Sequence, residues 1–288
     1  MRFIINYKGY ERFVLMKRGI VLVTAFILAM TLLVIISAKE ATNVTSPYSY
    51  SFSSSGILYE AGSDSKTTSP YWWLNSGAEL IIENGSGKTI QGNLISSDKW
   101  RLIYANSNPL DTDKGYHPQN IFRLYGRSLW TNYKQTAYFK INKDQLSLSP
   151  NRDSHNGLLL MNRIQDGNNL YYSGIRVDGQ AIIKKKQNGI YYTLASSKVY
   201  NGTYDRTKNP SLLPKNKWIG LRSEINTSNG ITNIKLYMDE GKKGIWKLLL
   251  NVNDTKSSQG TPITSRGRTG IRTDFMDVEF DDYSVVGK

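Results

Sequence analysis

The sequence predicts an all-β protein in which antiparallel strands form a two-sheet sandwich. Short segments of alternating apolar and polar residues recur along most of the chain, as expected of strands with one buried face. Asn-Gly and Asp-Gly pairs separate many of these segments, and because these residues tolerate positive φ, such pairs mark tight hairpin turns. The pairs begin at Asn84, Asn156, Asp166, Asp178, Asn188, Asn201 and Asn229. No window has the apolar periodicity of an amphipathic helix of three turns.

The chain begins with a basic stretch followed by an apolar segment, residues 19–37, that carries no charge. A basic flank keeps the N-terminus in the cytoplasm, so the residues after Lys39 are expected outside it. The segment has the length of a membrane anchor, while Ile36-Ser37-Ala38 has the small residues of a cleavage site. Residues 1–38 are therefore predicted to be a hydrophobic helix, either a signal peptide cleaved near Ala38 or a transmembrane anchor. Met1 and Met16 are both candidate start residues.

The expected exported part, residues 39–288, is basic. The whole chain has 37 Lys and Arg against 23 Asp and Glu. Residues 1–38 hold five of the basic residues and one of the acidic residues, so residues 39–288 keep 32 basic and 22 acidic residues, a net charge of +10. Outside the cytoplasm this charge favours an acidic polysaccharide, a wall polymer or an anionic lipid surface over nucleic acid. The chain has no cysteine, which excludes disulfides, thiolate catalysis and zinc-thiolate sites.

Residues 39–55 are rich in Ser and Thr and suit a tether. Tyr48, Tyr50 and Phe52 alternate within them, so a first edge strand is the alternative. Residues 56–288 are expected to form one domain, because sandwiches of about 200 to 250 residues commonly do.

The clearest strands form a predicted three-stranded meander. Its segments are Leu170–Val177, Gln180–Lys186 and Ile190–Ala195, joined by the turns at Asp178 and Asn188.

Period-two reading separates the two faces of each strand. The residues predicted to be buried include Phe122, Leu124, Ala137, Phe139, Ile141, Ile219, Leu221 and Ile225. Strand after strand, the other face carries a cation and often a tyrosine. Aromatic rings cover the apolar faces of sugars, and Arg and Lys pair with carboxylates or sulfates. If these strands share one sheet, they line a groove for an acidic polysaccharide; otherwise they are ordinary solvated faces. The predicted ligand-binding residues are Arg123, Tyr125, Tyr138, Tyr172, Arg176, Lys184, Arg222, Lys235 and Tyr237.

The region from Trp218 to Val285 resembles the closing strands of concanavalin A-like (laminin G-like, glucanase-like) jelly rolls. It contains Trp-Ile-Gly-Leu-Arg, Ile-Lys-Leu-Tyr-Met-Asp and the final Val-Glu-Phe-Asp-Asp-Tyr-Ser-Val. In that superfamily a Trp opens a strand, an Asp ends the next one, and a Phe-Asp-Asp strand finishes the domain. The resemblance implies a jelly-roll sandwich and a carbohydrate ligand. It covers strand pattern without a catalytic signature, and it assigns no specific family.

The same resemblance implies a structural calcium ion where the last strand meets the first. Asp281 and Asp282, with backbone oxygens near Glu60, are the candidate ligands because calcium prefers hard oxygen donors. The alternative is a terminal strand kept soluble by its acids.

Three carboxylates share one face of the last strand, at Asp277, Glu279 and Asp281. The spacing resembles the Glu-x-Asp-x-Glu strand of family-16 glycoside hydrolases, which implies a nucleophile and an acid in close reach. The acid types are inverted and the motif lies on the last strand. Glu279 is the candidate for catalysis.

β-Elimination of a uronate polymer needs a cation to neutralise the carboxylate and a base near the C5 proton. Jelly-roll alginate lyases use Arg, His and Tyr for these tasks, although their usual motifs are not visible here. The candidate set is His155 with Arg163, Tyr171, Tyr172 and Arg176. A turn residue is the alternative for His155.

The sequence thus predicts an exported or membrane-anchored protein that binds a carbohydrate, with an acidic polysaccharide as the expected partner. Whether it is also an enzyme stays open. A uronate lyase comes before a glycoside hydrolase as the alternative, with His155, Tyr172, Arg176 and Glu279 as candidate catalytic residues, and a non-enzymatic adhesion protein is the third reading. Apart from the calcium ion, no cofactor is expected.

Overall fold

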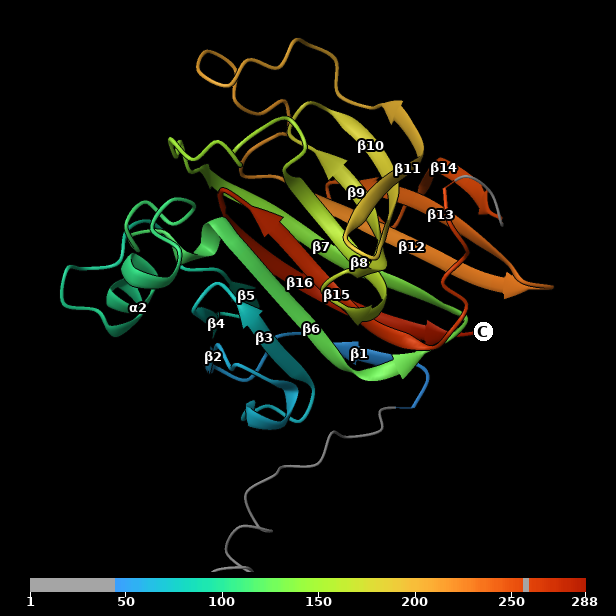
Figure 1. Ribbon diagram of the computed structural model, residues 1–288, viewed down its shortest axis with the longest axis horizontal. Coiled ribbons are helices and arrows are strands. Elements are labelled where there is room, and N and C mark those ends of the chain that lie inside the picture. The colour runs from blue at the N-terminus through green and yellow to red at the C-terminus, as the bar shows by residue number, and fades with distance from the viewer. Residues whose placement is uncertain (1–44, 256–258) are drawn as a thin grey trace, which may run out of the picture. The chain divides into compact units, whose positions relative to one another are not determined.

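The computed structural model describes residues 45–255 and 259–288, which form two antiparallel sheets packed face to face (Figure 1). The all-β, two-sheet prediction is confirmed. The predicted hydrophobic helix in residues 1–38 lies outside the described residues. Within the described ranges, the structure holds no helix that is long and apolar enough to cross a membrane.

The larger sheet has nine strands. In spatial order they are β14 (Lys247–Asp254), β13 (Ile231–Glu240), β12 (Trp218–Ser228), β7 (Tyr133–Asp144), β16 (Met276–Gly287), β5 (Ser86–Lys88), β4 (Glu79–Glu83) and β2 (Gly56–Tyr59), and β1 (Tyr48–Tyr50) also pairs with β16. Part of residues 39–55 therefore forms a strand.

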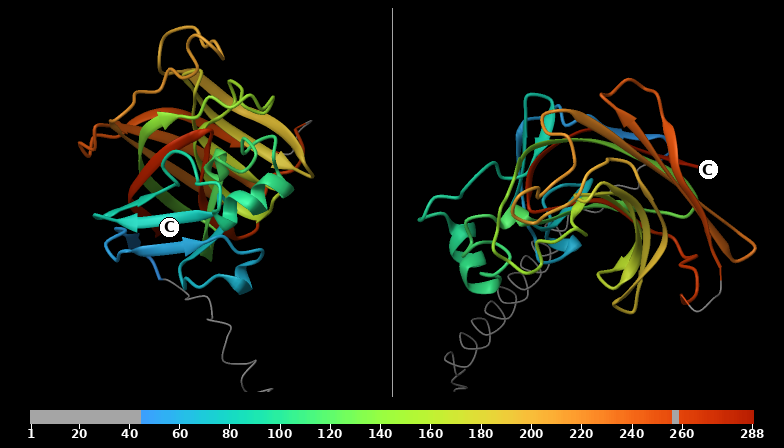
Figure 2. Two further views of the ribbon diagram at one scale, coloured as in Figure 1. Left: turned by 90° about the vertical axis from the view of Figure 1, so that its left-hand side faces the viewer. Right: turned by 90° about the horizontal axis from the view of Figure 1, so that it is seen from above.

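The smaller sheet has seven strands. Their order is β11 (Ile190–Lys198), β10 (Gln180–Gln187), β9 (Asn169–Arg176), β8 (Gly157–Asp166), β15 (Gly267–Asp274), β6 (Ile121–Trp130) and β3 (Trp72–Ser76). Both sheets appear as curved layers when the molecule is seen from above (Figure 2).

The main core lies between the two sheets, where alternate residues of each strand meet. Each of the eight residues predicted to be buried has a relative exposure of 0%. Phe122 of β6 stacks on Phe280 of β16 with ring centroids 5.3 Å apart, so aromatic contacts join the layers directly. The period-two assignment of the inner faces is confirmed.

The predicted meander is β9, β10 and β11, paired antiparallel as expected. Two-residue turns with positive φ at both positions occur at Asn84-Gly85, Asn188-Gly189 and Asn229-Gly230. The hairpin prediction is wrong at Asn156, where Gly157 begins β8, and at Asn201, which lies in a loop. Pairs of this kind suit many loop conformations, so the dipeptide alone does not specify a hairpin.

One helix was not expected from the pattern: α2 (Lys99–Ser107), which begins at an Asp98 side chain that accepts the N–H groups of Trp100 and Arg101. Only Tyr104 of this helix is buried. A nine-residue helix with a single buried residue has almost no apolar periodicity, which explains why the sequence did not reveal it. Two short 3-10 helices span Asp64–Lys66 and Pro118–Asn120.

Candidate functional site

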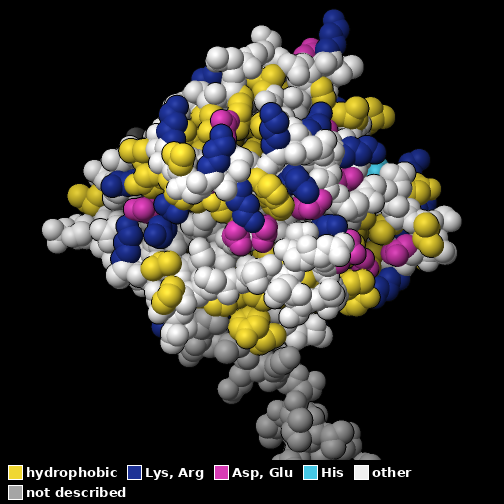
Figure 3. All heavy atoms as spheres, turned by 180° about the vertical axis from the view of Figure 1, so that it is seen from behind, with side chains coloured by type: hydrophobic (Ala, Val, Ile, Leu, Met, Phe, Trp, Pro, Cys, Tyr) yellow, Lys and Arg dark blue, Asp and Glu magenta, His cyan; other side chains and the backbone are white. Residues whose placement is uncertain are grey.

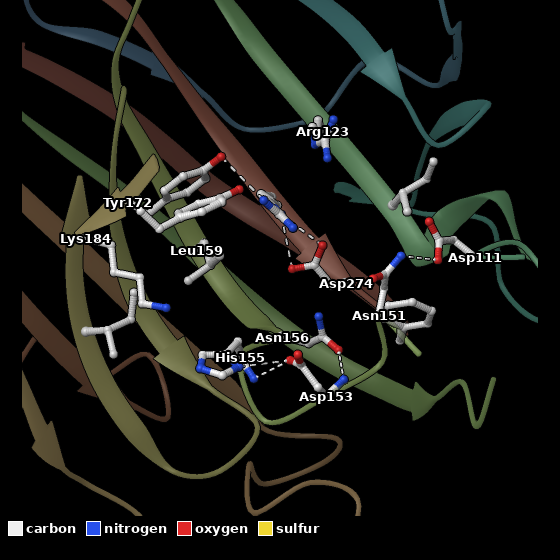
Figure 4. Close-up of a pocket in the computed structure, with 15 residues that line it drawn as sticks. Asp111, Arg123, Asn151, Asp153, His155, Asn156, Leu159, Tyr172, Lys184 and Asp274 are labelled. Atoms are coloured by element: carbon white, nitrogen blue, oxygen red, sulfur yellow. Dashed lines mark hydrogen bonds and ion pairs between the residues drawn. The ribbon is translucent and has the colours of Figure 1, made fainter. Parts of the chain in front are cut away.

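A cleft of about 530 Å³ lies on the outer face of the seven-stranded sheet. Strands β6, β15, β8, β9, β10 and β11 supply its floor and walls, and the segment from Asn151 to Asn156 closes one side (Figure 4). Outer-face residues alternate with core residues along each strand. Arg123 follows the buried Phe122 and Arg272 follows the buried Ile271, so both arginines point into the cleft.

Strand register brings the polar groups together. Arg123 of β6 stands opposite Arg272 of β15, which stands opposite Leu159 of β8. Tyr172 of β9 stands opposite Lys184 of β10. Two of the predicted ligand-binding cations, which are far apart in the sequence, therefore reach the same cleft.

The floor of the cleft belongs to a second apolar cluster outside the main core. It contains Leu159, Ile182, Tyr125 and Tyr172, and the last two are only 6% and 5% exposed. Trp73 covers the Tyr125 ring edge-on, with centroids 5.2 Å apart. The face predicted for both tyrosines is right, but their exposure is wrong, because neighbouring side chains on the outer face cover them.

Arg272 is the central polar residue of the cleft. Its Nε donates to both carboxylate oxygens of Asp274 at 2.9 and 3.1 Å, and its Nη1 reaches the Tyr172 hydroxyl at 3.4 Å. Burial would lower the pKa of Arg272, but the charge and hydrogen bonds of Asp274, together with the neighbouring Tyr172 and Tyr191, outweigh burial and raise it. The sequence reasoning did not single out this residue, although the alternation that identified Arg123 applies equally to it.

Tyr191 of β11 is the exposed aromatic ring of the site, at 52% relative exposure. It stacks beside Tyr172 with centroids 6.1 Å apart. Burial raises the pKa of Tyr172 to about 12. Burial would also raise the pKa of Tyr191, but the charges of Arg272 and Lys186 outweigh it and lower the pKa. Tyr191, like Arg272, was not among the predicted ligand-binding residues.

Two cations of the cleft have no partner. Within residues 45–255 and 259–288, no group accepts a hydrogen bond from Arg123 or Lys184, and none forms an ion pair with them. Burial and the nearby charge of Arg176 lower the pKa of Lys184. Arg176 itself, although predicted as a ligand-binding residue, pairs with Asp178 at 2.5 Å and does not line the cleft.

The acids of the cleft, in contrast, already have partners. Asp274 is held by Arg272, and Asp111 accepts hydrogen bonds from Ser149, Asn151 and Asn108 at 2.5 to 3.2 Å. Burial would raise the pKa of Asp111, but these bonds outweigh burial and lower it. The unsatisfied polar capacity of the cleft is therefore cationic.

His155 lies at the rim of the cleft. Its Nδ1 is 3.3 Å from Oδ1 of Asp153, which also accepts the His155 backbone N–H at 2.7 Å. Both side chains are close to half exposed. Figure 4 shows the pair across the cleft from Tyr172, so two of the predicted lyase residues share the site.

The other three members of that set do not line the cleft: Arg176, which pairs with Asp178, and the two residues Arg163 and Tyr171. Arg163 and Tyr171 are fully buried and point between the sheets. Arg163 donates to the carbonyls of Thr131 and Ile263 at 3.0 and 2.7 Å. The predicted assembly is wrong for both residues. Tyr171 and Tyr172 are consecutive residues of β9, so Tyr171 points to the core face when Tyr172 points to the outer face. A β-bulge around Arg163, where φ is +47°, turns the Arg163 side chain inward.

The predicted single groove is also wrong. Tyr138, Arg222, Lys235 and Tyr237 belong to β7, β12 and β13, on the outer face of the nine-stranded sheet. The whole core separates them from the cleft. Alternation tells which residues share a face of a strand, but the assignment of strands to sheets depends on pairing distant in sequence.

The three carboxylates of β16 lie outside the cleft and have separate partners. Asp277 accepts hydrogen bonds from Gln119 and Gln145 at 2.9 and 2.7 Å. Glu279 pairs with Lys140 at 2.9 Å. Burial would raise the pKa of Glu279, but its partners outweigh burial and lower it. A general acid needs the opposite shift, so the lowered pKa of Glu279 suits a nucleophile and not the acid that a hydrolase also needs.

The residues of the expected calcium site do not fit a cation either. Asp281 and Asp282 both pair with the ammonium group of Lys242, which engages an oxygen of each carboxylate and offsets one of their two negative charges. The Glu60 carboxylate accepts the N–H of Ala78 and the hydroxyl of Tyr104. In the part of the chain that the structure describes, no three metal-ligating side chains come together.

No protein-family model matches the sequence, and no curated protein matches it. Similar solved structures include the carbohydrate-binding module CBM66 from Bacillus subtilis, with 13% identity and a TM-score of 0.46 over 75% of this chain and 95% of that one. A winged bean acidic lectin in complex with methyl-α-D-galactose has 12% identity and a TM-score of 0.47, over 83% of this chain and 97% of the lectin.

The β-glucanase of Bacillus licheniformis has 10% identity and a TM-score of 0.44, over 85% of this chain and 99% of the enzyme. These are the kinds of protein that the resemblance to concanavalin A-like jelly rolls implied. At such identities the likeness concerns the fold and carries nothing about ligand or activity.

Proposed function

We propose that this chain binds an acidic polysaccharide in the cleft of the seven-stranded sheet. One observation carries the proposal: Arg123 and Lys184 line the cleft from two different strands, and no described residue pairs with either. A half-buried cation without a hydrogen-bonded or ion-pair partner loses hydration that no direct contact replaces. An acid group on a ligand recovers that loss, with a bidentate pair available at the guanidinium.

The apolar part of the cleft suits the rest of a sugar. Tyr191 presents a half-exposed ring, and Leu159 and Ile182 form an apolar floor between the two free cations. Aromatic and aliphatic surfaces of this kind cover the C–H faces of sugar rings. A sugar that carries a carboxylate or a sulfate uses both properties at once, whereas a neutral sugar leaves the cations unsatisfied.

The location proposed for this activity is extracytoplasmic. The support is the apolar segment of residues 19–37 with its basic flank, which suits a membrane anchor or a signal peptide cleaved near Ala38. Outside the cell, acidic polysaccharides are accessible ligands for a basic protein.

The test is native electrophoresis of the full chain through gels cast with alginate, pectate, neutral laminarin or no polymer. We expect retardation by an acidic polymer and not by laminarin. The double variant Arg123→Ala/Lys184→Ala should be retarded less, because both free cations are gone.

The control is Lys208→Ala/Arg266→Ala, which removes the same charge at two exposed positions away from the cleft. If the cleft variant and this control are retarded equally, the proposed site is wrong. Free migration of the wild-type chain in every gel would leave an adhesive or structural role as the better reading.

A second candidate function is β-elimination of the same polymer. The observation that favours it is that His155, Tyr172 and Tyr191 line the cleft beside the cations, and that Arg272 and Lys186 lower the pKa of Tyr191. An ionised tyrosine near a cation can accept the C5 proton while Arg123 or Lys184 neutralises the carboxylate. The C4=C5 double bond then forms, the C4–O glycosidic bond breaks, and the leaving oxygen takes a proton from the tyrosine or from water.

Elimination produces an unsaturated uronate whose ultraviolet absorbance rises with time. Tyr191→Phe and His155→Ala should abolish that rise and leave retardation in the gel intact. A chain that binds alginate or pectate but never produces the unsaturated product is a binding protein.

A further inference from the structure

We infer that the outer face of the nine-stranded sheet is a second binding surface for a carboxylate-bearing polysaccharide, so that one molecule holds two polymer chains. The choice of ligand rests on the proposed function, while the site rests on separate residues. These residues, called the outer patch, are Lys134, Arg222, Lys235, Tyr237 and Trp246.

The cations of the outer patch lie on neighbouring strands. Glu224 of β12 stands opposite both Lys134 of β7 and Lys235 of β13, and Arg222 is two residues away on the same face. Adjacent strands are about 4.8 Å apart and same-face residues about 7 Å apart, so the three cations are separated by roughly 7 to 10 Å. That spread suits successive acid groups of a polymer better than one small anion.

These cations are available to a ligand. Among the residues that the structure describes, none accepts a hydrogen bond from Lys134 or Lys235 or forms an ion pair with them, and Arg222 makes one long bond, to Thr136 at 3.4 Å. The acid between them, Glu224, is already paired with Lys288 at 2.8 Å. A polyanion therefore meets more positive than negative charge here.

Arg222 is held in place before any ligand arrives. Its guanidinium lies 3.8 Å from the centroid of the Trp246 ring, a cation–π contact. Trp246 and Tyr138 pack over Gly220, where a Cβ would come within 2.9 and 2.6 Å of them. The N–H groups of Lys243 and Gly244 donate to Asp239 and fix the loop that carries Trp246. Such preorganisation lowers the entropy lost on binding.

The outer patch holds part of the net positive charge of residues 39–288, which the cleft does not hold. The cleft has three cations and three carboxylates, so its formal charges cancel; they are Arg123, Lys184, Arg272, Asp111, Asp153 and Asp274. The excess of +10 in residues 39–288 therefore lies elsewhere. The view from behind shows Lys and Arg side chains spread among hydrophobic ones over that face (Figure 3). Because the core separates the two faces, two polymer chains can bind without contact.

The test counts binding sites by titration calorimetry of the full chain with a short oligomannuronate. We expect two oligomers bound per wild-type chain, one for Arg123→Ala/Lys184→Ala, and one for Lys134→Ala/Lys235→Ala, a pair that leaves the packed Arg222 in place. The combined variant should bind none. Beads coated with alginate should be bridged by wild-type protein and by neither double variant.

The control Lys208→Ala/Arg266→Ala should keep both sites. The inference is overturned if wild type binds one oligomer that is lost in Arg123→Ala/Lys184→Ala, if Lys134→Ala/Lys235→Ala still binds two, or if anionic lipid vesicles compete with the oligomer at the outer patch and bind more tightly. Loss of all binding in the outer-patch variant alone, with no effect of the cleft variant, overturns the proposed cleft and leaves the outer patch standing. Absence of any binding to wild type overturns both.

Discussion

At the scale of single residues, the buried pair of Lys185 and Asp254 shows how the sandwich closes along one edge. The Lys185 Nζ lies 2.9 and 3.0 Å from the two carboxylate oxygens, and both side chains are shielded from solvent. Tyr171 donates a third bond to the same carboxylate at 2.6 Å. Lys185 is on β10 and Asp254 on β14, so the pair connects the two sheets. The sequence offered no signal for it, since Lys184, Lys185 and Lys186 form a uniform basic run.

Replacing Lys185 by Met should lower the free energy of unfolding by about 3 to 5 kcal/mol, because it leaves the buried charge of Asp254 without a cation beside it. Chemical denaturation measures the change. The neighbouring Lys186→Met serves as the matched control, since Lys186 is on the other face, where it donates to the Gly167 carbonyl at 2.9 Å and lies 5.1 Å from the centroid of the Tyr191 ring. An equal effect of the two substitutions would contradict the role given to the buried pair.

Asp239 makes stability depend on pH in a defined direction. Burial would raise its pKa, but the Tyr138 hydroxyl and the N–H groups of Gly244 and Lys243 outweigh burial and lower the pKa below its ordinary 3.8. A pKa lowered by folding means that the ionised group stabilises the fold above the ordinary value. This contribution is lost as the pH falls through the folded-state pKa.

Asp239→Asn should therefore cost about 1 to 3 kcal/mol of unfolding free energy at neutral pH, since the donors then face a neutral amide. Denaturation at a series of pH values should show the difference from wild type shrinking below about pH 4, where the unfolded-state carboxyl becomes protonated. A difference that stays constant down to low pH would exclude Asp239 as its source.

At the scale of elements, the strands of the meander were predictable because each has a continuous alternation and a short connection. The β-bulge in β8 was not, because it inserts a residue without any change in composition. It reverses the alternation around Arg163 and explains why that residue left the predicted lyase set.

The β12–β13 hairpin tests the turn argument. Asn229 and Gly230 have φ of +51° and +75°, a region that disfavours a Cβ. Gly230→Ala should lower the free energy of unfolding by about 1 to 2 kcal/mol. Gly56→Ala is the control, because its φ is not positive and no atom lies within 4 Å of the added Cβ. Equal stability of the two variants, measured by thermal and chemical denaturation, would show that the turn tolerates the strain.

At the scale of the whole molecule, the two faces of the sandwich carry different chemistry. The cleft combines paired acids, two free cations and tyrosines over an apolar floor, whereas the outer patch presents three cations, one of them held by the Trp246 ring. Salt should therefore affect the two sites differently. Binding at the outer patch depends on more charges that mobile ions screen, while the contribution of the apolar floor in the cleft is not screened.

Added sodium chloride should weaken binding of oligomannuronate to the cleft variant Arg123→Ala/Lys184→Ala more steeply than to the outer-patch variant Lys134→Ala/Lys235→Ala. Calorimetric titrations at increasing salt give the two slopes. Identical slopes would mean that one kind of site accounts for both variants.

The fold class could be predicted from the sequence, and so could the inner faces of the strands and the presence of outward cations and tyrosines. Each of these follows from local rules: the two-residue period of a strand, and the tolerance of Asn and Gly for positive φ. The sequence also placed Arg123, Tyr172, Lys184 and His155 among the candidate site residues, and all four line the cleft.

Which of these side chains share a surface could not be predicted, because it depends on how the strands pair. Arg123 and Lys184 meet because β6 and β10 belong to one sheet, and Arg222 and Lys235 do not join them because β12 and β13 belong to the other. Strand pairing depends on contacts between residues far apart in the chain, and alternation within one strand contains no information about its neighbours. Packing likewise decides which cations have an ion-pair partner within the protein. The cations without such a partner are the ones that an acidic ligand can pair with.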